Sequence, residues 1–403
     1  MSMLPSLKTD NPRHRFRFAR EALSAVMVIT AAALLGGCSV PYYWQAVTGQ
    51  VSLLNRRVPI EAAIEDPQTD AQTREALRTV LEVRRFAVDE LGLPQNRSYS
   101  TYVDLSGGNA GSESGEAGSA GGNAGSGAGR RRANNSLVWS VVAAEEFSID
   151  PRTWCFPFAG CVSYRGYFNE DAARRYAARL QGEGMDVAVG GATAYSTLGY
   201  FADPVVSTMI GGPEFRTVEL ILHELAHQKF YLRGDSDLNE AFATVVAEYG
   251  TERWLMRRGE TGSLTAYRQQ ALVQAQFADL IGRQRERLRE IYAGSEPAVE
   301  KRRAKEAAFE TLRSEYAALK PAWEGRVNYD GWIARPLNNA HIASVATYRY
   351  WVPGLHWLLE SRGLGAFYEE VETLAALDED ERRLRLLDWR NRALEAVDPA
   401  RPE

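Results

Sequence analysis

The chain has 403 residues, of which 45% are hydrophobic and 25% are charged, and its net charge is −5. This composition is ordinary for a globular protein, and the length allows a large core in one or two domains. The acidic balance excludes the basic surface that is expected of a nucleic-acid-binding protein.

The N-terminal region is typical of a secretory signal, which we expect to span residues 1–37. A basic start (Arg13, Arg15, Arg17 and Arg20) precedes a mostly apolar stretch at 22–35, which is too short for a comfortable transmembrane span. The segment ends in Leu35-Gly36-Gly37-Cys38, which resembles a bacterial lipobox. This resemblance implies that Cys38 is lipidated and becomes the mature N-terminus, and Ser39 in place of Asp favours the outer membrane. We therefore predict a lipid-anchored protein of the bacterial cell envelope that faces the periplasm. The alternative is an ordinary cleaved signal with a chance cysteine.

The next part of the chain is expected to be helical from 40 to 93, and its clearest helix is Ala71–Leu91. Ser98–Leu105 and Leu137–Ala143 alternate as strands do. Residues 106–136 are dominated by Gly, Ser, Ala and Asn, so they cannot bury enough apolar surface to become ordered. We expect a flexible insertion there, at the tip of a hairpin that the two strands form.

Cys155 and Cys161 are the only thiols that remain once Cys38 is lipidated. An even pair of cysteines in an oxidising compartment predicts one disulfide that closes a small loop. The alternative is a pair of free, buried thiols.

The later elements are short strands followed by long helices. Val162–Phe168, Met185–Val189 and Thr193–Leu198 are expected to be strands, and Asn169–Glu183 a helix. Residues 265–320 contain two long, charged segments with helical patterns, separated by the sequence Gly-Ser-Glu-Pro. This arrangement predicts a helical hairpin. Together these elements predict an α+β fold that is mainly helical and has a small antiparallel β-sheet.

Residues 221–231, Ile-Leu-His-Glu-Leu-Ala-His-Gln-Lys-Phe-Tyr, contain the pattern with the most specific chemistry. His223 and His227 are four apart, so on a helix their imidazoles share a face and can converge on one metal ion. Glu224 can reach a metal-bound water, and the whole is the H-E-x-x-H pattern of zinc proteases. Further along, Leu-Asn-Glu-Ala-Phe-Ala supplies Glu240 as a third ligand. Two His, one Glu and an open fourth position describe a catalytic site with one zinc ion per chain.

Two ordinary interpretations compete with this site. The histidines could be solvated residues of an exposed helix, although Val218, Leu222, Leu225 and Ala226 give that helix an apolar face. Glu240 could be the capping-box partner of Asp237.

The chemistry of such a site assigns further roles. Zinc lowers the pKa of bound water and polarises a carbonyl, while Glu224 acts as general base and then delivers the proton to the leaving amine. The tetrahedral intermediate needs a hydrogen-bond donor opposite the metal. We expect Tyr348, and after it His341, in this role; the alternative for Tyr348 is an ordinary core tyrosine. The expected strand at Ala194–Leu198 is either a ledge for substrate backbone or a plain core strand.

The motif His-Glu-Leu-Ala-His followed by Leu-Asn-Glu-Ala-Phe-Ala resembles the gluzincin metallopeptidases, especially the aminopeptidase N type. The resemblance implies a zinc ion held by His223, His227 and Glu240, Glu224 as the base, and a zincin-like fold with the small sheet beside the H-E-x-x-H helix. The chain departs from that family in two respects. Its spacer of twelve residues between His227 and Glu240 is shorter, and the Gly-x-Met-x-Asn motif that recognises the free α-amine is absent.

The whole mature chain resembles more closely a bacterial family described as putative zinc aminopeptidases. Besides the zinc motif, the shared segments are Trp154-Cys155-Phe156-Pro157, Gly160-Cys161-Val162, Tyr164-Arg165-Gly166-Tyr167-Phe168, Tyr195-Ser196-Thr197-Leu198-Gly199 and Leu337-Asn338-Asn339-Ala340.

Three functions are consistent with these observations. Residues 38–403 would form a zinc metallopeptidase domain, an aminopeptidase held in the envelope through Cys38. The alternatives are a zinc endopeptidase that acts on envelope proteins or peptidoglycan peptides, and a non-catalytic zinc-binding lipoprotein. The intact Glu224 argues against the last, because a structural zinc site does not need a general base. The expected partners are a peptide or protein substrate and the membrane, and no nucleic acid.

Overall fold

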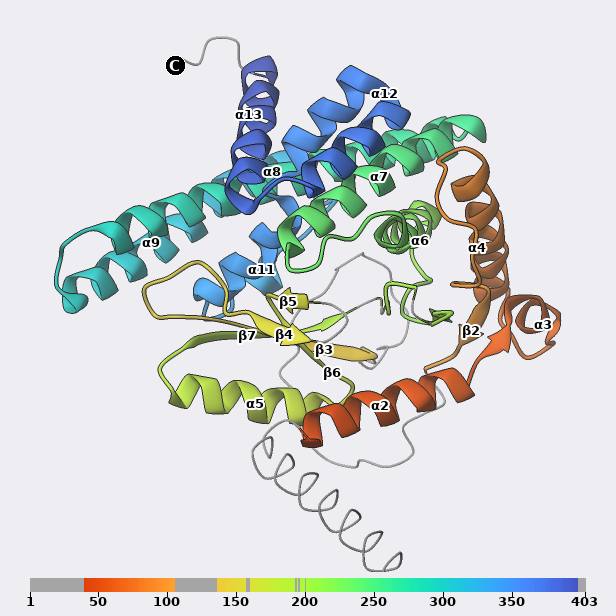
Figure 1. Ribbon diagram of the computed structural model, residues 1–403, viewed down its shortest axis with the longest axis horizontal. Helices are drawn as coiled ribbons and strands as arrows, with labels where there is room; N and C mark the ends of the chain where they lie inside the picture. Colours follow the sequence, from red (N-terminus) through yellow and green to blue (C-terminus); the bar gives the residue numbers. More distant parts are fainter. Residues whose placement is uncertain are drawn as a thin grey trace, which may run out of the picture. The chain divides into compact units, whose positions relative to one another are not determined.

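The computed structural model of the chain describes residues 40–105, 136–156, 160–192, 194, 196–199 and 201–397 (Figure 1). The expected signal, Cys38 and almost all of the expected insertion at 106–136 lie outside these residues. The chain divides into two compact units, of which one ends at Ser52 and the other begins at Leu53. The described part of the first unit is the beginning of helix α2 (Val40–Asn55).

The second unit is mainly helical. After the end of α2 its helices are α3 (Ile60–Glu65), α4 (Ala71–Asp89), α5 (Glu170–Gly182), α6 (Glu214–Lys229), α7 (Ser236–Arg257), α8 (Thr261–Ala293), α9 (Ala298–Leu319), α10 (Asp330–Ile333), α11 (Asn339–Arg349), α12 (Val352–Ala375) and α13 (Glu379–Val397), with a 3-10 turn at Lys320–Trp323. Its strands are β1 (Val58–Pro59), β2 (Thr101–Val103), β3 (Val138–Ala144), β4 (Trp154–Phe156), β5 (Gly160–Val162), β6 (Arg165–Tyr167), β7 (Asp186–Ala192) and β8 (Val205–Val206). The described strands belong to three small sheets, so the structure confirms the predicted α+β fold, mainly helical with little sheet.

Strand β3 lies between β6 and β7 and is antiparallel to both. Trp139 pairs with Tyr167 on one side and with Gly191 on the other, and α5 packs against this sheet (Figure 1). In a second sheet, β2 lies between β1, which is antiparallel to it, and β8, which is parallel. The antiparallel pair β4–β5 forms the third sheet.

Two predictions about the strands are wrong. β2 and β3 lie in different sheets, so the segments before and after residues 106–136 are not the arms of one hairpin. The alternation of apolar and polar residues shows that a strand buries one face, but it does not identify the neighbouring strand. The predicted strand at Thr193–Leu198 is also wrong at its described residues, which are irregular or in a turn. There the backbone N–H and the hydroxyl of Thr197 both bind the carboxylate of Asp203, so this backbone is satisfied without a neighbouring strand.

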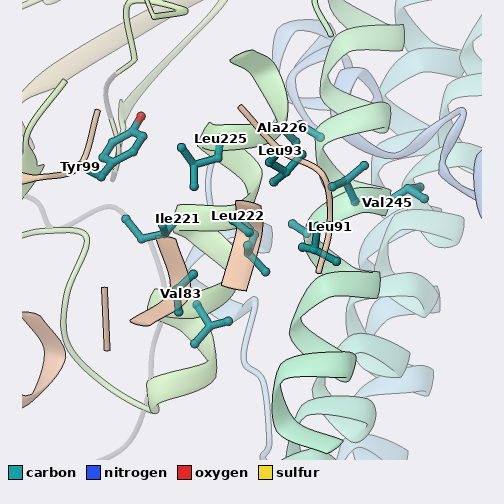
Figure 2. Packing of buried hydrophobic residues seen from close by; sticks show 14 of the residues in the cluster. Val83, Leu91, Leu93, Tyr99, Ile221, Leu222, Leu225, Ala226 and Val245 are labelled. Carbon is teal, nitrogen blue, oxygen red and sulfur yellow. The ribbon is translucent and has the colours of Figure 1, made fainter. Parts of the chain in front are cut away.

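Helix α6 lies within the larger hydrophobic core. It begins after Pro213 with Glu214 in its first turn, where a negative charge is favourable to the helix dipole. The predicted apolar face is confirmed, since Val218, Leu222, Leu225 and Ala226 are all buried. Figure 2 shows part of this face beside residues of α4, of α7 and of the segment that follows α4.

Helix α7 approaches its neighbours very closely at Gly250. A β-carbon at this position would lie 2.6 Å from Leu91 Cδ1 and 2.7 Å from Leu222 Cδ1, which is too close for carbon atoms. The glycine therefore permits the observed separation of α6 and α7.

Helices α8 and α9 share a second core. Leu280, Ile281 and Leu288 of α8 pack in one cluster with Phe309 and Leu312 of α9, and Figure 1 shows the two helices side by side. None of the helices in the described part of the chain is long and apolar enough to cross a membrane.

Candidate metal centre

Helix α6 places the two histidines of the H-E-x-x-H motif on one face, as their spacing predicts. The centroids of the two rings are 4.8 Å apart, and the two Nε2 atoms are 3.2 Å apart. His227 is buried and His223 is partly exposed, so the pair lies at the edge of the core.

Helix α7 brings Glu240 to the same point. Its Oε2 atom lies 3.2 Å from Nε2 of His223 and 3.5 Å from Nε2 of His227. Among the described residues, these three form the one group of His, Cys, Asp and Glu side chains whose ligand atoms are close enough together to hold a metal ion.

The turn between α6 and α7 determines where Glu240 lies. The side chain of Asn239 accepts a hydrogen bond from the N–H of Leu232 and donates one to the carbonyl oxygen of the same residue, at 2.7 and 2.8 Å. Asp235 is the N-cap of α7, and its carboxylate accepts a backbone N–H from the first turn. The cap is therefore Asp235 and not Asp237, and the carboxylate of Glu240 faces the histidines rather than a helix end.

The spacing of the three donor atoms fits a tetrahedral zinc site. Zinc–nitrogen and zinc–oxygen distances of about 2.0–2.1 Å place the ligand atoms of a tetrahedron about 3.3 Å apart. The three separations in this structure are 3.2, 3.2 and 3.5 Å. Two imidazoles and one carboxylate are also a donor set of catalytic zinc sites. Other divalent transition metals accept the same donors. The structure therefore shows a possible metal site, and the donor set alone does not identify the metal.

The carboxylate of Glu240 and the imidazole of His227 shift each other's pKa values toward the charged forms. Burial alone would raise the pKa of Glu240, but the two imidazoles outweigh it and bring the pKa well below the ordinary value. Burial lowers the pKa of His227, but the attraction of Glu240 outweighs it and the net shift is upward. Glu240 is therefore ionised at neutral pH, which is the state in which a carboxylate binds a metal.

Glu224 lies between the histidines in sequence but outside their cluster of donor atoms. The residue is 8% exposed. Burial is the largest influence on its pKa and raises it; the neighbouring histidines oppose this shift, and the charge of Glu240 adds to it. A carboxylate with a raised pKa beside a candidate metal centre is suited to accept a proton and to hold it.

Tyr99 also belongs to this region, although no sequence motif pointed to it. Its side chain is fully buried, and its hydroxyl lies beside the carboxylates of Glu224 and Asp203. Its backbone has a φ of 58°, in the left-handed region that bulky residues rarely adopt, and its N–H donates to the carbonyl of Asp203 at 2.6 Å. Burial, and then the two carboxylates, raise the pKa of Tyr99 well above its ordinary value, so the hydroxyl keeps its proton. This hydroxyl has no hydrogen-bond partner among the described residues, so its proton is available to a neighbouring acceptor.

Asp203 forms the hydrogen bonds that fix the segment around Thr197. Its carboxylate accepts hydrogen bonds from the backbone N–H and the hydroxyl of Thr197, both at 2.8 Å. Burial raises the pKa of Asp203 to about 6, and the charge of Glu224 adds to this shift. The one sequence signal for this region is Ser196-Thr197-Leu198-Gly199, part of a segment on which the family resemblance in the sequence rests. No spacing rule could connect it with Tyr99 or Asp203.

The two residues predicted to face the reacting carbonyl both belong to α11. The backbone of Tyr348 is part of this helix, but its side chain lies outside what the structure describes. His341 has Nδ1 at 2.7 Å from Oδ1 of Asn338, and its ring packs edge-on against Trp332. Burial, followed by the charge of Arg335, lowers the pKa of His341 to about 4. These contacts direct the ring of His341 to Asn338 and Trp332.

The two asparagines beside His341 fasten α11 to the sheet. The side chain of Asn339 donates to the carbonyl oxygens of Glu145 and Glu146, at 3.1 and 3.0 Å, and its N–H donates to the carboxylate of Asp186 at 2.9 Å. Asn338 donates to a carbonyl of β7 at 3.0 Å. The polar density that singled out this segment in the sequence therefore has a structural explanation.

Another acidic group on α7, the mostly buried Glu248, pairs with residues other than the histidines of α6. Its carboxylate accepts hydrogen bonds from Arg349 and His356. Burial opposes ionisation, but the charge of Arg349 and the contact with His356 bring the pKa of Glu248 down to about 2.

The predicted disulfide between Cys155 and Cys161 is present in the β4–β5 hairpin. Gly160 in this hairpin has a φ of 78°, and a β-carbon there would lie 3.0 Å from the backbone nitrogen of Gly234. The hairpin therefore packs directly against the turn that joins α6 to α7.

Comparison with known proteins gives one match. The model of a family described as putative aminopeptidase matches residues 41–110 and 132–386, which is most of the chain and includes the three donor residues and Glu224. No curated protein and no solved structure matches the chain.

Proposed function

We propose that this chain, which belongs to the putative aminopeptidase family, is a zinc-dependent aminopeptidase. Family membership supports a peptidase that acts on peptides. The metallo-type, the choice of zinc and the likeness to gluzincins rest on one observation: donor atoms of His223, His227 and Glu240 converge from two helices, with the buried carboxylate of Glu224 next to them in sequence.

The proposed mechanism assigns a role to each of these residues. His223, His227 and Glu240 would hold the zinc ion, which when bound lowers the pKa of water and polarises the scissile carbonyl. Glu224 accepts the proton of the attacking water and passes it to the leaving amine. Tyr99, whose hydroxyl has no hydrogen-bond partner in the part of the chain that the structure describes, would orient the nearby carboxylate of Glu224 by donating a hydrogen bond to it. Tyr348 remains our proposal for the donor that stabilises the developing oxyanion.

We also propose a location for the protein in the cell. The basic and apolar residues of the segment 1–37 and the lipobox-like ending at Cys38 support a lipid anchor in the cell envelope, at the outer membrane and facing the periplasm. The disulfide between Cys155 and Cys161 supports an oxidising compartment.

The test compares two classes of substrate. The purified chain from Ser39 is assayed on amino-acid arylamides, which only an exopeptidase that needs a free α-amine cleaves efficiently, and on internally quenched peptides with blocked ends. We expect arylamide hydrolysis that a chelator abolishes and added zinc restores. Cleavage confined to the blocked peptides would replace the aminopeptidase by an endopeptidase. Failure of zinc-loaded protein to cleave either class would contradict the peptidase proposal.

A further inference from the structure

Helix α2 has four strongly exposed apolar side chains on one face. Val40, Trp44, Val47 and Val51 are 56%, 70%, 57% and 50% exposed. Their spacing of four, three and four residues places them on one face of the helix, which we call the α2 stripe. On the opposite side of the helix, Leu53 is buried. A surface helix normally has the opposite arrangement, with polar residues outward.

The composition of α2 adds to this observation. Its 16 residues, Val-Pro-Tyr-Tyr-Trp-Gln-Ala-Val-Thr-Gly-Gln-Val-Ser-Leu-Leu-Asn, include no Asp, Glu, Lys or Arg. Tyr43, next to the stripe, is 44% exposed. A contiguous exposed apolar surface marks a site of interaction, and Trp and Tyr are enriched where a protein meets the headgroup region of a bilayer.

The position of α2, directly after the expected lipid anchor, indicates that the partner of the stripe is a lipid surface. Cys38 precedes Val40 by two residues, which span at most about 7 Å. Acyl chains on Cys38 would thus hold the first turn of α2 at the bilayer. A helix of 16 residues is about 24 Å long, and no helix in the described part of the chain is long and apolar enough to cross a membrane. Such a helix can bury its apolar face only by lying along the surface.

We propose that α2 lies in the plane of the membrane surface with Val40, Trp44, Val47 and Val51 inserted among the lipid headgroups and the upper acyl chains. The orientation of the helix rests on the envelope anchor proposed above, whereas the affinity of its stripe for lipid does not need the anchor. The stripe is therefore a second, non-covalent attachment, which adds to the retention by acyl chains.

The experiment uses the chain from Ser39 to Glu403, which lacks Cys38 and keeps every described residue. Sedimentation with vesicles of phosphatidylethanolamine and phosphatidylglycerol measures its partition to lipid. The stripe variant combines Val40→Gln, Trp44→Gln and Val47→Gln. The control variant combines Leu272→Gln, Val299→Gln and Leu384→Gln, three residues of α8, α9 and α13 that are 59%, 57% and 67% exposed.

We expect the starting chain and the control variant to bind vesicles equally, and the stripe variant to bind at least about tenfold more weakly. Melting curves establish that all three are folded, and Trp44→Gln alone replaces the triple variant if that one is not. Equal binding by stripe and control variants, or no binding by the starting chain, would overturn the proposal. Mass spectrometry of the full chain expressed in a bacterium reports lipidation of Cys38 separately, so a missing anchor is distinguished from an inactive stripe.

Discussion

The hydroxyl of Tyr99 lies beside the carboxylate of Glu224, and both side chains are buried next to the candidate metal centre. Tyr99 keeps this place in spite of a left-handed backbone conformation, which is unfavourable for a large side chain. The cost of that conformation is met by the surrounding core and by the hydrogen bond from its N–H to Asp203. We conclude that the position of the Tyr99 hydroxyl is closely defined.

Tyr99→Phe removes this hydroxyl and leaves the ring. A hydrogen bond to a charged group contributes about 1.5–3 kcal/mol, so we expect kcat to fall by about 10- to 100-fold, with KM and zinc content unchanged. Steady-state kinetics and metal analysis measure these quantities. Tyr267→Phe is the control, because Tyr267 is also buried but its hydroxyl pairs with Glu219. If Tyr99→Phe keeps the full kcat, the positioning role is excluded.

Glu240→Ala should lose zinc because it removes one of three ligands. Metal analysis of the purified variant should find almost none, whereas we expect one ion per chain in the starting protein. Glu252→Ala is the matched control on the same helix, since Glu252 pairs with Arg268 and should leave the metal in place. Full zinc retention by the Glu240 variant would remove this residue from the site.

Glu224→Gln keeps the shape of the side chain but cannot accept a proton. Because Glu224 is not one of the three converging donors, the variant should hold zinc normally. Hydrolysis should fall by about two to four orders of magnitude, which is the usual contribution of general-base catalysis. Rates are compared at matched zinc content. An active, zinc-loaded Glu224→Gln protein would require a different base.

Gly250→Ala should destabilise the protein, since a methyl group there collides with Leu91 and Leu222. Overpacking of a core costs about 1–3 kcal/mol, measured as a lower free energy of unfolding in denaturant. Gly282→Ala in α8 is the control, because a β-carbon there meets nothing within 4 Å. That control should be stabilised by up to about 1 kcal/mol through its better helix propensity. Equal effects of the two substitutions would argue against the close approach of α6 and α7.

Glu219 should make stability depend on pH. Burial, and then the charge of Glu248, raise its pKa from 4.5 to about 7. The native state therefore keeps a proton that the unfolded chain releases, so this contribution is fully present below pH 4.5 and is lost as pH rises through about 7. Glu219→Gln removes the dependence, and its stability relative to the starting protein should increase between pH 5 and 8, on the order of 3 kcal/mol. Unfolding in denaturant at the two pH values measures the difference. A constant difference would contradict the raised pKa.

Sequence by itself determined the local features of this protein. The spacing of His223 and His227 places them on one helical face because a helix repeats every 3.6 residues. The apolar positions of α6 predicted its buried side for the same reason. The pairing of Cys155 with Cys161 followed from the small number of thiols, and the mainly helical fold followed from periodicity.

Only the tertiary structure decided which distant segments meet. β2 pairs with β8 and not with β3, because the alternation of a strand specifies a buried face and not a neighbour. Tyr99 and Asp203 reach Glu224 through the packing of separate segments, and nothing in their own sequence encodes that contact. The role of Asp235 as the cap of the helix that carries Glu240 likewise depended on the path of the turn. Local patterns arise from backbone geometry within a few residues, whereas these contacts arise from the way in which the whole chain buries its apolar surface.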